Sequence, residues 1–452
     1  MSDEDSAYFD QYGQVPSDWY VLPLREVTDF QEGPGILAKD FHEAGVPLIR
    51  LRNITSPVVQ LGGCNYLNPE TVEKKWSHFR LRCGDFLIST SASLGRVSEV
   101  DSVSAGSIAY TGIIRFRTNN ERLYHPYLRA YLSSNVFVRQ AERMATGSVI
   151  KHFGPSHLRK MAITIPTLPE QREIAETFDS FDKRITLLRE TNKTLEAIAQ
   201  AIFKSWFVDF DPVKAKMDGR QPTGMDEETA ALFPDELVES ELGLIPKGWE
   251  VKPVGDVVTT VGGGTPDTKN TDYWMPAMHS WTSPKDLAGI SSPVLVSTAR
   301  SISDKGLARI SSGLLPKGTL LLSSRAPIGY LAIADLPVAI NQGYIAMTPA
   351  SGSLSPVYML HWCKANMEVI KGQANGSTFM EISKTTFRRL PIILPPKRIA
   401  DSFSALAQQL FTRITLNVRQ ADHLADLRDT LLPRLISGKL RVPIDEAETS
   451  KA

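Results

Sequence analysis

Two loops of the sequence combine a Gly-Ser pair with basic residues on either side. Gly147-Ser148 lies within residues 139–160, which carry five basic residues and one acidic residue. Gly376-Ser377 lies within residues 364–389, which carry five basic and two acidic residues. Lysine and arginine neutralise phosphates, and Ser, Thr, Asn and His side chains can hydrogen-bond base edges. This chemistry nominates Arg143, Ser148, Lys151, His152 and Lys160 in the first loop, and Asn375, Ser377, Thr378, Lys384 and Arg388 in the second.

A second matched pair of polar turns is formed by residues 89–96 (STSASLGR) and 323–329 (SSRAPIG). Arg96 and Arg325 in these turns could face a nucleic acid, although a structural turn is the favoured explanation. A solvated loop would also explain any single residue of the Gly-Ser loops. Because the Gly-Ser pair recurs, we treat the loops and Arg325 as candidate DNA contacts.

Motifs for catalysis by the chain itself are weak. An amino-methyltransferase needs Pro-Pro between Asn or Asp and an aromatic residue, but Pro395-Pro396 stands between Leu394 and Lys397. The sequence contains no Walker A loop, and its glycine run at 262–264 opens into Thr265-Pro266 and not into a helix. A loose metal-nuclease pattern, Pro234-Asp235 followed by Glu250-x-Lys252, is short enough to arise by chance. No histidines are spaced as a helical metal pair. We therefore predict a binding protein that is not an enzyme and holds no cofactor or metal.

Composition places the chain among soluble globular proteins of two or three domains. It has 452 residues, 42% hydrophobic and 22% charged, and no apolar run long enough for a membrane span. The N-terminus is acidic and unlike a signal peptide, and three scattered cysteines suggest reduced thiols, so we expect a cytoplasmic location. Net charge is zero, but residues 1–10, 207–243 and 443–452 together carry −13. The rest of the chain is therefore distinctly basic, which suits an anionic partner.

The elements that must position these loops include a long helix predicted over residues 167–207. Thr167, Pro169 and Glu170 form a helix start with a capping box. A heptad seam then runs for more than four heptads with one polar member, Asn192. Its predicted inward residues are Ile174, Phe178, Phe181, Ile185, Leu188, Asn192, Leu195, Ala199, Ile202 and Trp206.

A second long helix is predicted after Pro395-Pro396, running to about Ile436, with a kink at Pro433 and an end at Gly438. Its seam, placed 225 residues after the first, is Ile399, Phe403, Leu406, Leu410, Arg413, Asn417, Gln420, Leu424, Leu427 and Leu431. A neighbouring apolar stripe contains Phe411, Ile414, Val418 and Ala421. We therefore expect this helix to contact another chain as well as the first helix.

The two helices belong to a repeat of about 230 residues. Landmarks such as Trp19 and Trp249, Tyr127 and Tyr358, or the two Gly-Ser pairs recur at offsets between 225 and 234. In the first copy, residues 46–51, 85–90 and 108–116 resemble strands and residues 127–144 resemble a helix. We predict an α+β fold, a pseudo-twofold tandem repeat of two similar α/β domains, each followed by a long helix. The predicted segments are 1–17 (lead), 18–166 (first domain), 167–207 (helix), 208–243 (acidic linker), 244–394 (second domain), 395–438 (helix) and 439–452 (tail).

We expect the helices to pair as an antiparallel coiled coil, with Asn192 and Asn417 fixing its register. Solvent-facing asparagines, or two helices that pack only on their own domains, remain alternatives. Two basic domains on a spacer of fixed length suit duplex DNA, because the spacing of half-sites is measured in helical turns. The domains differ strongly in sequence between residues 49–75 and 277–303, so we expect two different half-sites.

The chain resembles the specificity subunits of Type I restriction–modification systems. The resemblance rests on PxxW at 16–19 and 246–249, LPEQREIAETFDSFDKRI at 168–185, FKSWFVDFDPV at 203–213 and LLPRLISGKLRV at 431–442. It implies two target-recognition domains that read an asymmetric bipartite site in double-stranded DNA, with the helices as spacer. It also implies docking of two modification subunits, which methylate adenine with S-adenosylmethionine, and of restriction subunits that use ATP and Mg²⁺. The second helix departs from the pattern, with Pro-Lys-Arg at 396–398 in place of Glu-Gln-Arg.

Two other functions remain as alternatives. A scaffold that binds only proteins would show no salt-dependent binding of duplex DNA. A stand-alone nuclease would cut DNA in a metal-dependent way that Glu250→Ala abolishes.

Overall fold

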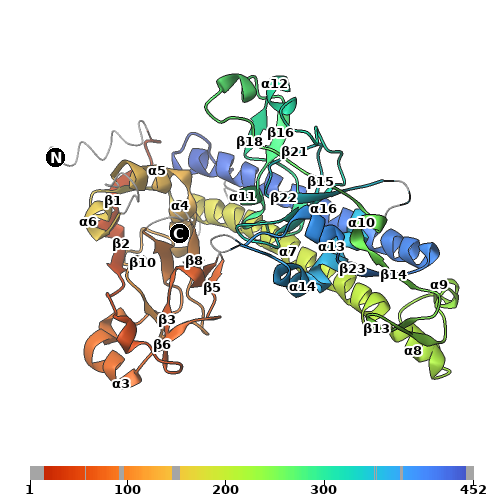
Figure 1. The fold of residues 1–452 in the computed structure, drawn as a ribbon. Coiled ribbons are helices and arrows are strands. Elements are labelled where there is room, and N and C mark those ends of the chain that lie inside the picture. Colours follow the sequence, from red (N-terminus) through yellow and green to blue (C-terminus); the bar gives the residue numbers. More distant parts are fainter. Residues whose placement is uncertain are drawn as a thin grey trace. The chain divides into compact units, whose positions relative to one another are not determined.

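The structure, a computed structural model, describes residues 15–55, 57–90, 96–144, 153–350, 352, 354–376 and 380–443. The chain forms two compact units. The first combines the residues up to Ile185 with those from His423 onward, and the second spans Thr186–Asp422. Each unit therefore contains one globular domain and a part of each long helix (Figure 1). None of the helices in these ranges is both long enough and apolar enough to cross a membrane.

The globular domain of the first unit is built on a six-stranded sheet with the order β2-β10-β7-β8-β5-β4. It also contains a small sheet, β6-β3-β9, and an antiparallel pair, β1-β11. Its strands are β1 (Tyr20–Pro23), β2 (Thr28–Glu32), β3 (Val46–Ile49), β4 (Ile54–Thr55), β5 (Val58–Val59), β6 (Asn65–Leu67), β7 (Phe86–Ser89), β8 (Val97–Glu99), β9 (Ile108–Ala109), β10 (Ile113–Thr118) and β11 (Ala162–Ile165). Its α-helices are α2 (Leu24–Val27), α3 (Pro69–Thr71), α4 (His125–Ser133), α5 (Asn135–Met144) and α6 (Pro155–Leu158).

One strand predicted in this domain, 108–116, is in fact two. The chain turns between β9 and β10, and Gly112 in the turn has a φ of +82°, a conformation that residues with a side chain rarely adopt. β9 pairs with β3 of the small sheet, whereas β10 lies within the main sheet. The apolar run 108–116 therefore contributes one strand to each of two sheets.

The globular domain of the second unit has a five-stranded sheet with the order β15-β22-β19-β20-β17, a small sheet β18-β16-β21 and the pairs β14-β23 and β12-β13. Its strands are β12 (Leu237–Ser240), β13 (Gly243–Pro246), β14 (Glu250–Pro253), β15 (Thr259–Gly262), β16 (His279–Thr282), β17 (Val294–Leu295), β18 (Arg300–Ile302), β19 (Leu320–Ser323), β20 (Leu331–Ala334), β21 (Ala339–Ile340), β22 (Tyr344–Thr348) and β23 (Pro391–Leu394). Its α-helices are α8 (Asp211–Met217), α9 (Glu227–Ala231), α10 (Val254–Val257), α11 (Pro284–Leu287), α12 (Asp304–Leu307), α13 (Pro356–Ala365), α14 (Met367–Gly372) and α15 (Lys384–Arg388).

The predicted tandem repeat and α+β fold are confirmed strand by strand. With β4 set aside, the two main sheets have the same order, and both end in a parallel pair, β5 with β8 and β17 with β20.

One position in each domain, equivalent in the repeat, can hold only glycine. A Cβ atom on Gly33 would lie 2.0 Å from the carbonyl oxygen of Ala109, and one on Gly263 would lie 2.0 Å from that of Ile340. Both domains thus repeat a close backbone crossing that excludes side chains.

The first long helix, α7 (Leu168–Phe207), has 40 residues and buries the predicted seam. Seven of the ten seam residues are buried and the other three are half-buried. At its start, Glu170 accepts hydrogen bonds from the backbone N–H of Thr167 (3.2 Å) and from the Thr167 hydroxyl (2.8 Å). The Thr167 hydroxyl acts as the donor in this bond, because a buried carboxylate needs hydrogen-bond donors.

The second long helix, α16 (Lys397–Ile436), also has 40 residues but buries a different stripe from the predicted one. Four predicted seam residues are exposed: Leu406, Arg413, Gln420 and Leu427. The buried stripe contains Phe403, Ala407, Phe411, Ile414, Asn417 and Ala421. The seam prediction was therefore wrong at these four positions, whereas Ile399, Phe403 and Asn417 of the seam are buried, together with Phe411, Ile414 and Ala421 of the neighbouring apolar stripe. The first half of α16 packs into the core of the second unit, so the buried residues from Phe403 to Phe411 step by four. The helix continues through Pro433, and Gly438, with a φ of +72°, follows its end.

The stretch 208–243, expected as a linker, is folded. It contains α8, α9 and β12, and its side chains Phe210, Val213 and Phe233 are buried in the core of the second unit. The ring of Phe233 lies 5.3 Å from that of Trp206 at the end of α7. These three buried apolar side chains attach the acidic segment to the second unit.

Asn192 and Asn417 meet inside the second unit. The Asn417 amide donates to the Asn192 side-chain oxygen (2.8 Å), and the Asn192 amide donates to the carbonyl oxygen of Ile414 (3.4 Å). Both side chains are buried, so in the structure neither faces solvent. The helix segments run antiparallel here, since Phe203 further along α7 packs on Phe403 earlier in α16.

Replacing Asn192 alone by Ala is expected to lower the free energy of unfolding by about 1–2 kcal/mol, because it leaves the Asn417 amide buried with one partner fewer. Replacing both asparagines by Leu should recover this loss, since an apolar pair has no polar group to satisfy. Urea unfolding of both variants measures the difference. Losses that simply add in the double variant would contradict a direct coupling between the two amides.

Candidate nucleic-acid interface

In the second unit, the predicted site residues gather at one edge of the main sheet. Strands β19 and β15 end there, and β22 and β20 begin there. Backbone hydrogen bonds join the loops: Ser324 N–H donates to the Gly343 carbonyl (2.8 Å), and Ile382 N–H donates to the Ser324 carbonyl (3.1 Å). Arg325 and Asn375 both form backbone bridges with Glu381. We call this edge, residues 262–265, 324–329, 341–343, 375–376 and 380–384, the loop edge of the second domain.

The first domain contains the same arrangement. Thr90 N–H donates to the Gly112 carbonyl (2.9 Å), and Phe153 N–H donates to the Thr90 carbonyl (3.3 Å). These bonds match those of the second domain after an offset of about 230 residues. In both domains, the chain that follows the Gly-Ser pair therefore returns to the same edge of the main sheet. This edge is thus a conserved feature of the internal repeat.

Several predicted contacts lie outside the described residues: Ser148, Lys151, His152, Ser377 and Thr378. Of those that are described in the second domain, Arg325 and Asn375 belong to the loop edge and Lys384 begins α15. Lys384 is exposed, and its ammonium would lie 3.9 Å from a Cβ atom on Gly262, which places it beside the end of β15. Three of the predicted residues are thus brought together.

In the first domain the two described candidates are not brought to the corresponding edge. Arg143 is exposed at the end of α5 and lines a cavity of about 190 Å³ together with Arg139, Pro433 and Lys439. Lys160 is exposed after α6, and its backbone N–H donates to His157 (2.9 Å). Arg143 thus lies beside the end of α16 and not among the loops.

Hydrogen bonds and ion pairs divide the basic residues of the second domain into two groups. Arg388 donates to the hydroxyl and the carbonyl oxygen of Thr260, at 2.6 Å each, so it ties α15 to β15. Lys364 pairs with Glu196 of α7 (3.1 Å). Arg325 keeps only a long ion pair with Glu381 (3.5 Å), and Lys384 has no ion pair with another described residue. Lys384 and Arg325 are therefore the cations best placed for an anionic ligand.

One feature that the sequence did not predict is an arginine over two aromatic rings beside each small sheet. The Arg300 guanidinium lies 3.4 Å from the ring centre of Trp274 and 5.4 Å from that of Trp281. In the first domain, Arg50 lies 5.6 Å from Tyr110 and 5.9 Å from Phe41. The two arginines share no motif and no offset, so sequence patterns could not reveal them. Trp281 also donates to the Gly264 carbonyl (3.1 Å), which connects this cluster to the loop edge.

The loose nuclease pattern does not form a carboxylate cluster in the structure. Glu250 pairs with Lys252 on the same strand (2.6 Å), and Glu236, next to Asp235, pairs with Lys247 (2.6 Å). Within the ranges that the structure describes, no group of three or more His, Cys, Asp or Glu side chains is arranged to hold a metal ion.

Comparison with known proteins agrees with this arrangement. The model of the family described as "Type I restriction modification DNA specificity domain" matches twice, over residues 16–197 and 246–419. The MjaIX specificity subunit of a Type I restriction enzyme from Methanocaldococcus jannaschii is 40% identical over 161 residues, which cover 35% of this chain and 37% of that protein. The putative MjaX specificity subunit of the same organism is 20% identical over 96% of both chains.

A solved structure shows the same fold. The Type I restriction–modification S subunit from M. genitalium aligns with a TM-score of 0.52 at 14% identity, covering 94% of this chain and 98% of that one. The curated relatives are named as specificity subunits, which are recognition subunits and not catalytic ones, so the nuclease alternative is set aside. With two copies of the specificity domain over most of its length, this chain belongs to the family of Type I restriction–modification specificity subunits.

Proposed function

We propose that the chain reads an asymmetric bipartite site in double-stranded DNA, with one half-site for each globular domain and the helix pair setting the spacer. The observation that carries the proposal is the duplicated loop edge, built with matching hydrogen bonds in both domains. Each copy is followed by a helix of 40 residues. Equal helices of about 60 Å suit a spacer, because a helix has a fixed rise per residue and its length does not depend on loops.

Two different half-sites follow from the differences between the domains. The two small sheets share one topology, β6-β3-β9 and β18-β16-β21, so the difference lies in the side chains that these sheets carry. The arginine–aromatic clusters are built from unrelated residues in the two domains. Side chains of different type in equivalent places would contact different base edges.

The helix pair is also the proposed docking surface for two modification subunits, and restriction subunits would join the full complex. Within the second unit, both helices leave large apolar side chains exposed: Leu187, Ile198, Leu406 and Leu416. Exposed apolar side chains on paired helices are typical of a surface that another protein covers. The partners would bring S-adenosylmethionine, ATP and Mg²⁺, and the complex would act in the cytoplasm.

Co-expression with the modification subunit, followed by genome-wide mapping of methylated adenines, tests the proposal. The expected result is one motif with two unlike halves and a constant gap between them. Methylation at a single uninterrupted motif would overturn the bipartite function. Absence of methylation together with absence of salt-dependent DNA binding by the assembled complex would favour a protein-binding scaffold.

Replacing Lys384 by Ala should weaken DNA binding by the complex on all sequences alike and lower the salt slope of log K by about one, because one phosphate contact is lost. Titrations of a labelled duplex at several salt concentrations measure the slope. Lys247→Ala is the control, since Lys247 is exposed on the same unit but pairs with Glu236 away from the loop edge. An equal effect of both variants would show that only net charge matters.

A further inference from the structure

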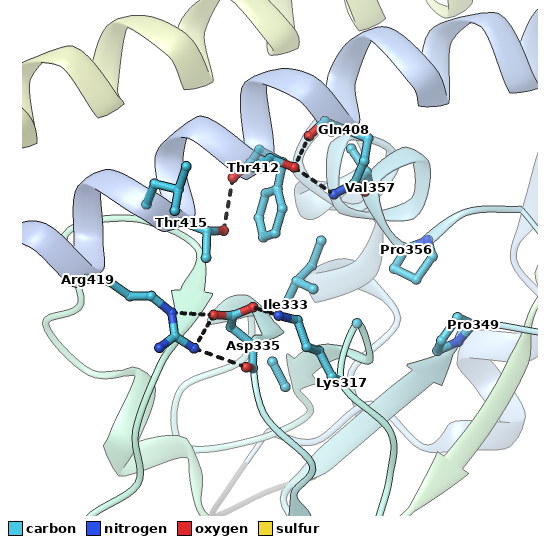
Figure 2. A pocket seen from close by; sticks show the side chains of 14 residues that line it. Lys317, Ile333, Asp335, Pro349, Pro356, Val357, Gln408, Thr412, Thr415 and Arg419 are labelled. Atoms are coloured by element: carbon cyan, nitrogen blue, oxygen red, sulfur yellow. Dashed lines mark hydrogen bonds and ion pairs between the residues drawn. The ribbon is translucent and has the colours of Figure 1, made fainter.

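The second unit contains a cavity between the outer face of α16 and the main sheet of its domain. Its volume is about 420 Å³, and its walls include Ile333 of β20, Val357 of α13 and Phe411 of α16. Figure 2 shows Pro356 and Gln408 at one end of the cavity and Arg419 with Asp335 at the other. Along this stretch, the cavity therefore separates α16 from the second domain.

The part of α16 that precedes and borders the cavity is held by apolar packing. Ile399, Phe403, Ala407, Phe411 and Ile414 are buried in the core of the second unit. Beyond them, Leu416 is exposed, and the Arg419 side chain is 53% exposed. At the far end of the cavity, a polar contact joins α16 to the domain.

That contact is a carboxylate shared by two cations. Arg419 donates through Nε to Asp335 Oδ2 (2.7 Å) and through Nη2 to the Asp335 carbonyl (3.4 Å). Lys317 Nζ lies 2.6 Å from Asp335 Oδ1. The Asp335 side chain is only 8% exposed, yet the pKa of its carboxyl lies below the ordinary value. Burial opposes ionisation, but the bonds from Lys317 and Arg419 outweigh it. We call Lys317, Asp335 and Arg419 the Asp335 clamp.

The Asp335 clamp and the loop edge lie at opposite ends of the same two strands. Asp335 follows β20 and Lys317 precedes β19, whereas the loop 324–329 connects the other ends of these strands. The strands pair antiparallel over their length. Four residues of strand span about 13 Å, so a tilt of roughly 15° at the clamp would move the loop edge by about 3.4 Å, the rise of one base pair.

We propose that the Asp335 clamp is a positioning device for spacer selection: it fixes the angle at which the second domain stands on α16, and so the exact base-pair gap that the chain accepts. The proposal rests on the proposed function of the helix pair as a spacer. Without the clamp, the cavity leaves room for the domain to tilt, because Leu416, the apolar residue of α16 that lines the cavity beside the clamp, is exposed and not tightly packed. The half-site itself, which is read by the loop edge, stays the same.

The test uses the full chain assembled with its modification subunits and a set of duplexes that carry the native half-sites with spacers from two base pairs shorter to two longer. The variants are Arg419→Ala and Asp335→Asn, with Arg419→Lys as the conservative replacement. Arg413→Ala is the matched control, since Arg413 is exposed on the same helix and has no ion pair with another described residue. The readout is the ratio of methylation at neighbouring spacers to methylation at the native spacer.

Arg419→Ala and Asp335→Asn are expected to raise this ratio by roughly fivefold, the effect of losing an ion pair of ordinary strength. Arg419→Lys should restore most of the selectivity, and Arg413→Ala should behave as the wild type. A wild-type ratio with the clamp variants would overturn the positioning role even if they lower thermal stability. A wild-type chain that methylates all spacers equally would instead overturn the spacer function, and the clamp with it.

Discussion

A chain that lacks residues 183–189 of α7 and 420–426 of α16 is expected to accept a spacer about three base pairs shorter, with both half-sites unchanged. Seven helical residues account for about 10.5 Å, and one base pair for about 3.4 Å. Because a heptad is close to two full turns, its removal restores nearly the same helix face, with a drift of about 20°. Mapping of methylated adenines in cells that express the shortened chain with its partners gives the new spacer directly.

These two segments are matched, and they leave the polar contacts on either side of them in place. Residues 183–189 lie between Asp182 and Asn192 in sequence, and residues 420–426 lie between Asn417 and Arg428. Asp182 pairs with Arg428 (2.6 Å), and Asn417 bonds Asn192 (2.8 Å). A deletion from α7 alone is the control, since it puts the remaining heptads out of register and should abolish methylation. An unchanged spacer in the matched deletion would refute the spacer function.

The sequence was most informative where structure repeats. The capping residues from Thr167 to Glu170 located the start of α7 within one residue, and heptad spacing predicted its buried face. The offsets of Trp19 and Trp249 or of Tyr127 and Tyr358 predicted two domains of one fold. These patterns are readable because each depends on periodicity or duplication, which needs no knowledge of contacts. Asn192 and Asn417 are also equivalent positions of the repeat. In an antiparallel pair equivalent positions face each other only near its centre, where these two asparagines meet.

Contacts that depend on the tertiary structure could not be predicted. A heptad count assumes that a helix packs on one other helix, but α16 also packs on its own domain, so Phe403, Ala407 and Phe411 form the buried stripe. Counting charges likewise overstated the free cations near the second Gly-Ser pair, because Lys364 pairs with Glu196 and Arg388 bonds Thr260. Which cation is already paired depends on residues distant in sequence.

Replacing Glu170 by Ala is expected to have the largest effect on the stability of the first unit, lowering its free energy of unfolding by about 3–5 kcal/mol. Glu170 is buried and accepts a hydrogen bond from the indole N–H of Trp19 (2.8 Å) as well as the bonds at the start of α7. It also forms an ion pair with Arg441, whose guanidinium bonds Asp18 (2.8 Å) and lies 5.6 Å from the Trp19 ring. One carboxylate thus joins the start of the domain, the start of α7 and the segment after α16.

Arg441→Ala should cost a large part of the same energy, because it leaves the Glu170 charge buried with neutral donors only. The double variant should be less destabilised than the sum of the single ones, which a double-mutant cycle in urea measures. Lys439→Ala is the matched control, since Lys439 is an exposed cation in the same segment. Losses below about 0.5 kcal/mol for both Glu170→Ala and Arg441→Ala would contradict this role, because that is the range of ordinary surface substitutions.

The corresponding tryptophan of the second unit explains why the effect should be confined to the first. The rings of Phe207 and Phe210 lie 5.9 and 5.6 Å from that of Trp249, and its indole N–H has no hydrogen-bond partner among the described residues. In the second unit, the end of α7 continues into the chain that leads to Trp249. Aromatic packing is therefore sufficient to hold Trp249 against the end of α7. At Trp19 the packed segment comes from the other end of the sequence, and charged groups make the connection. High salt should therefore weaken the Trp19 contact, through the exposed Arg441–Asp18 pair, more than the Trp249 contact.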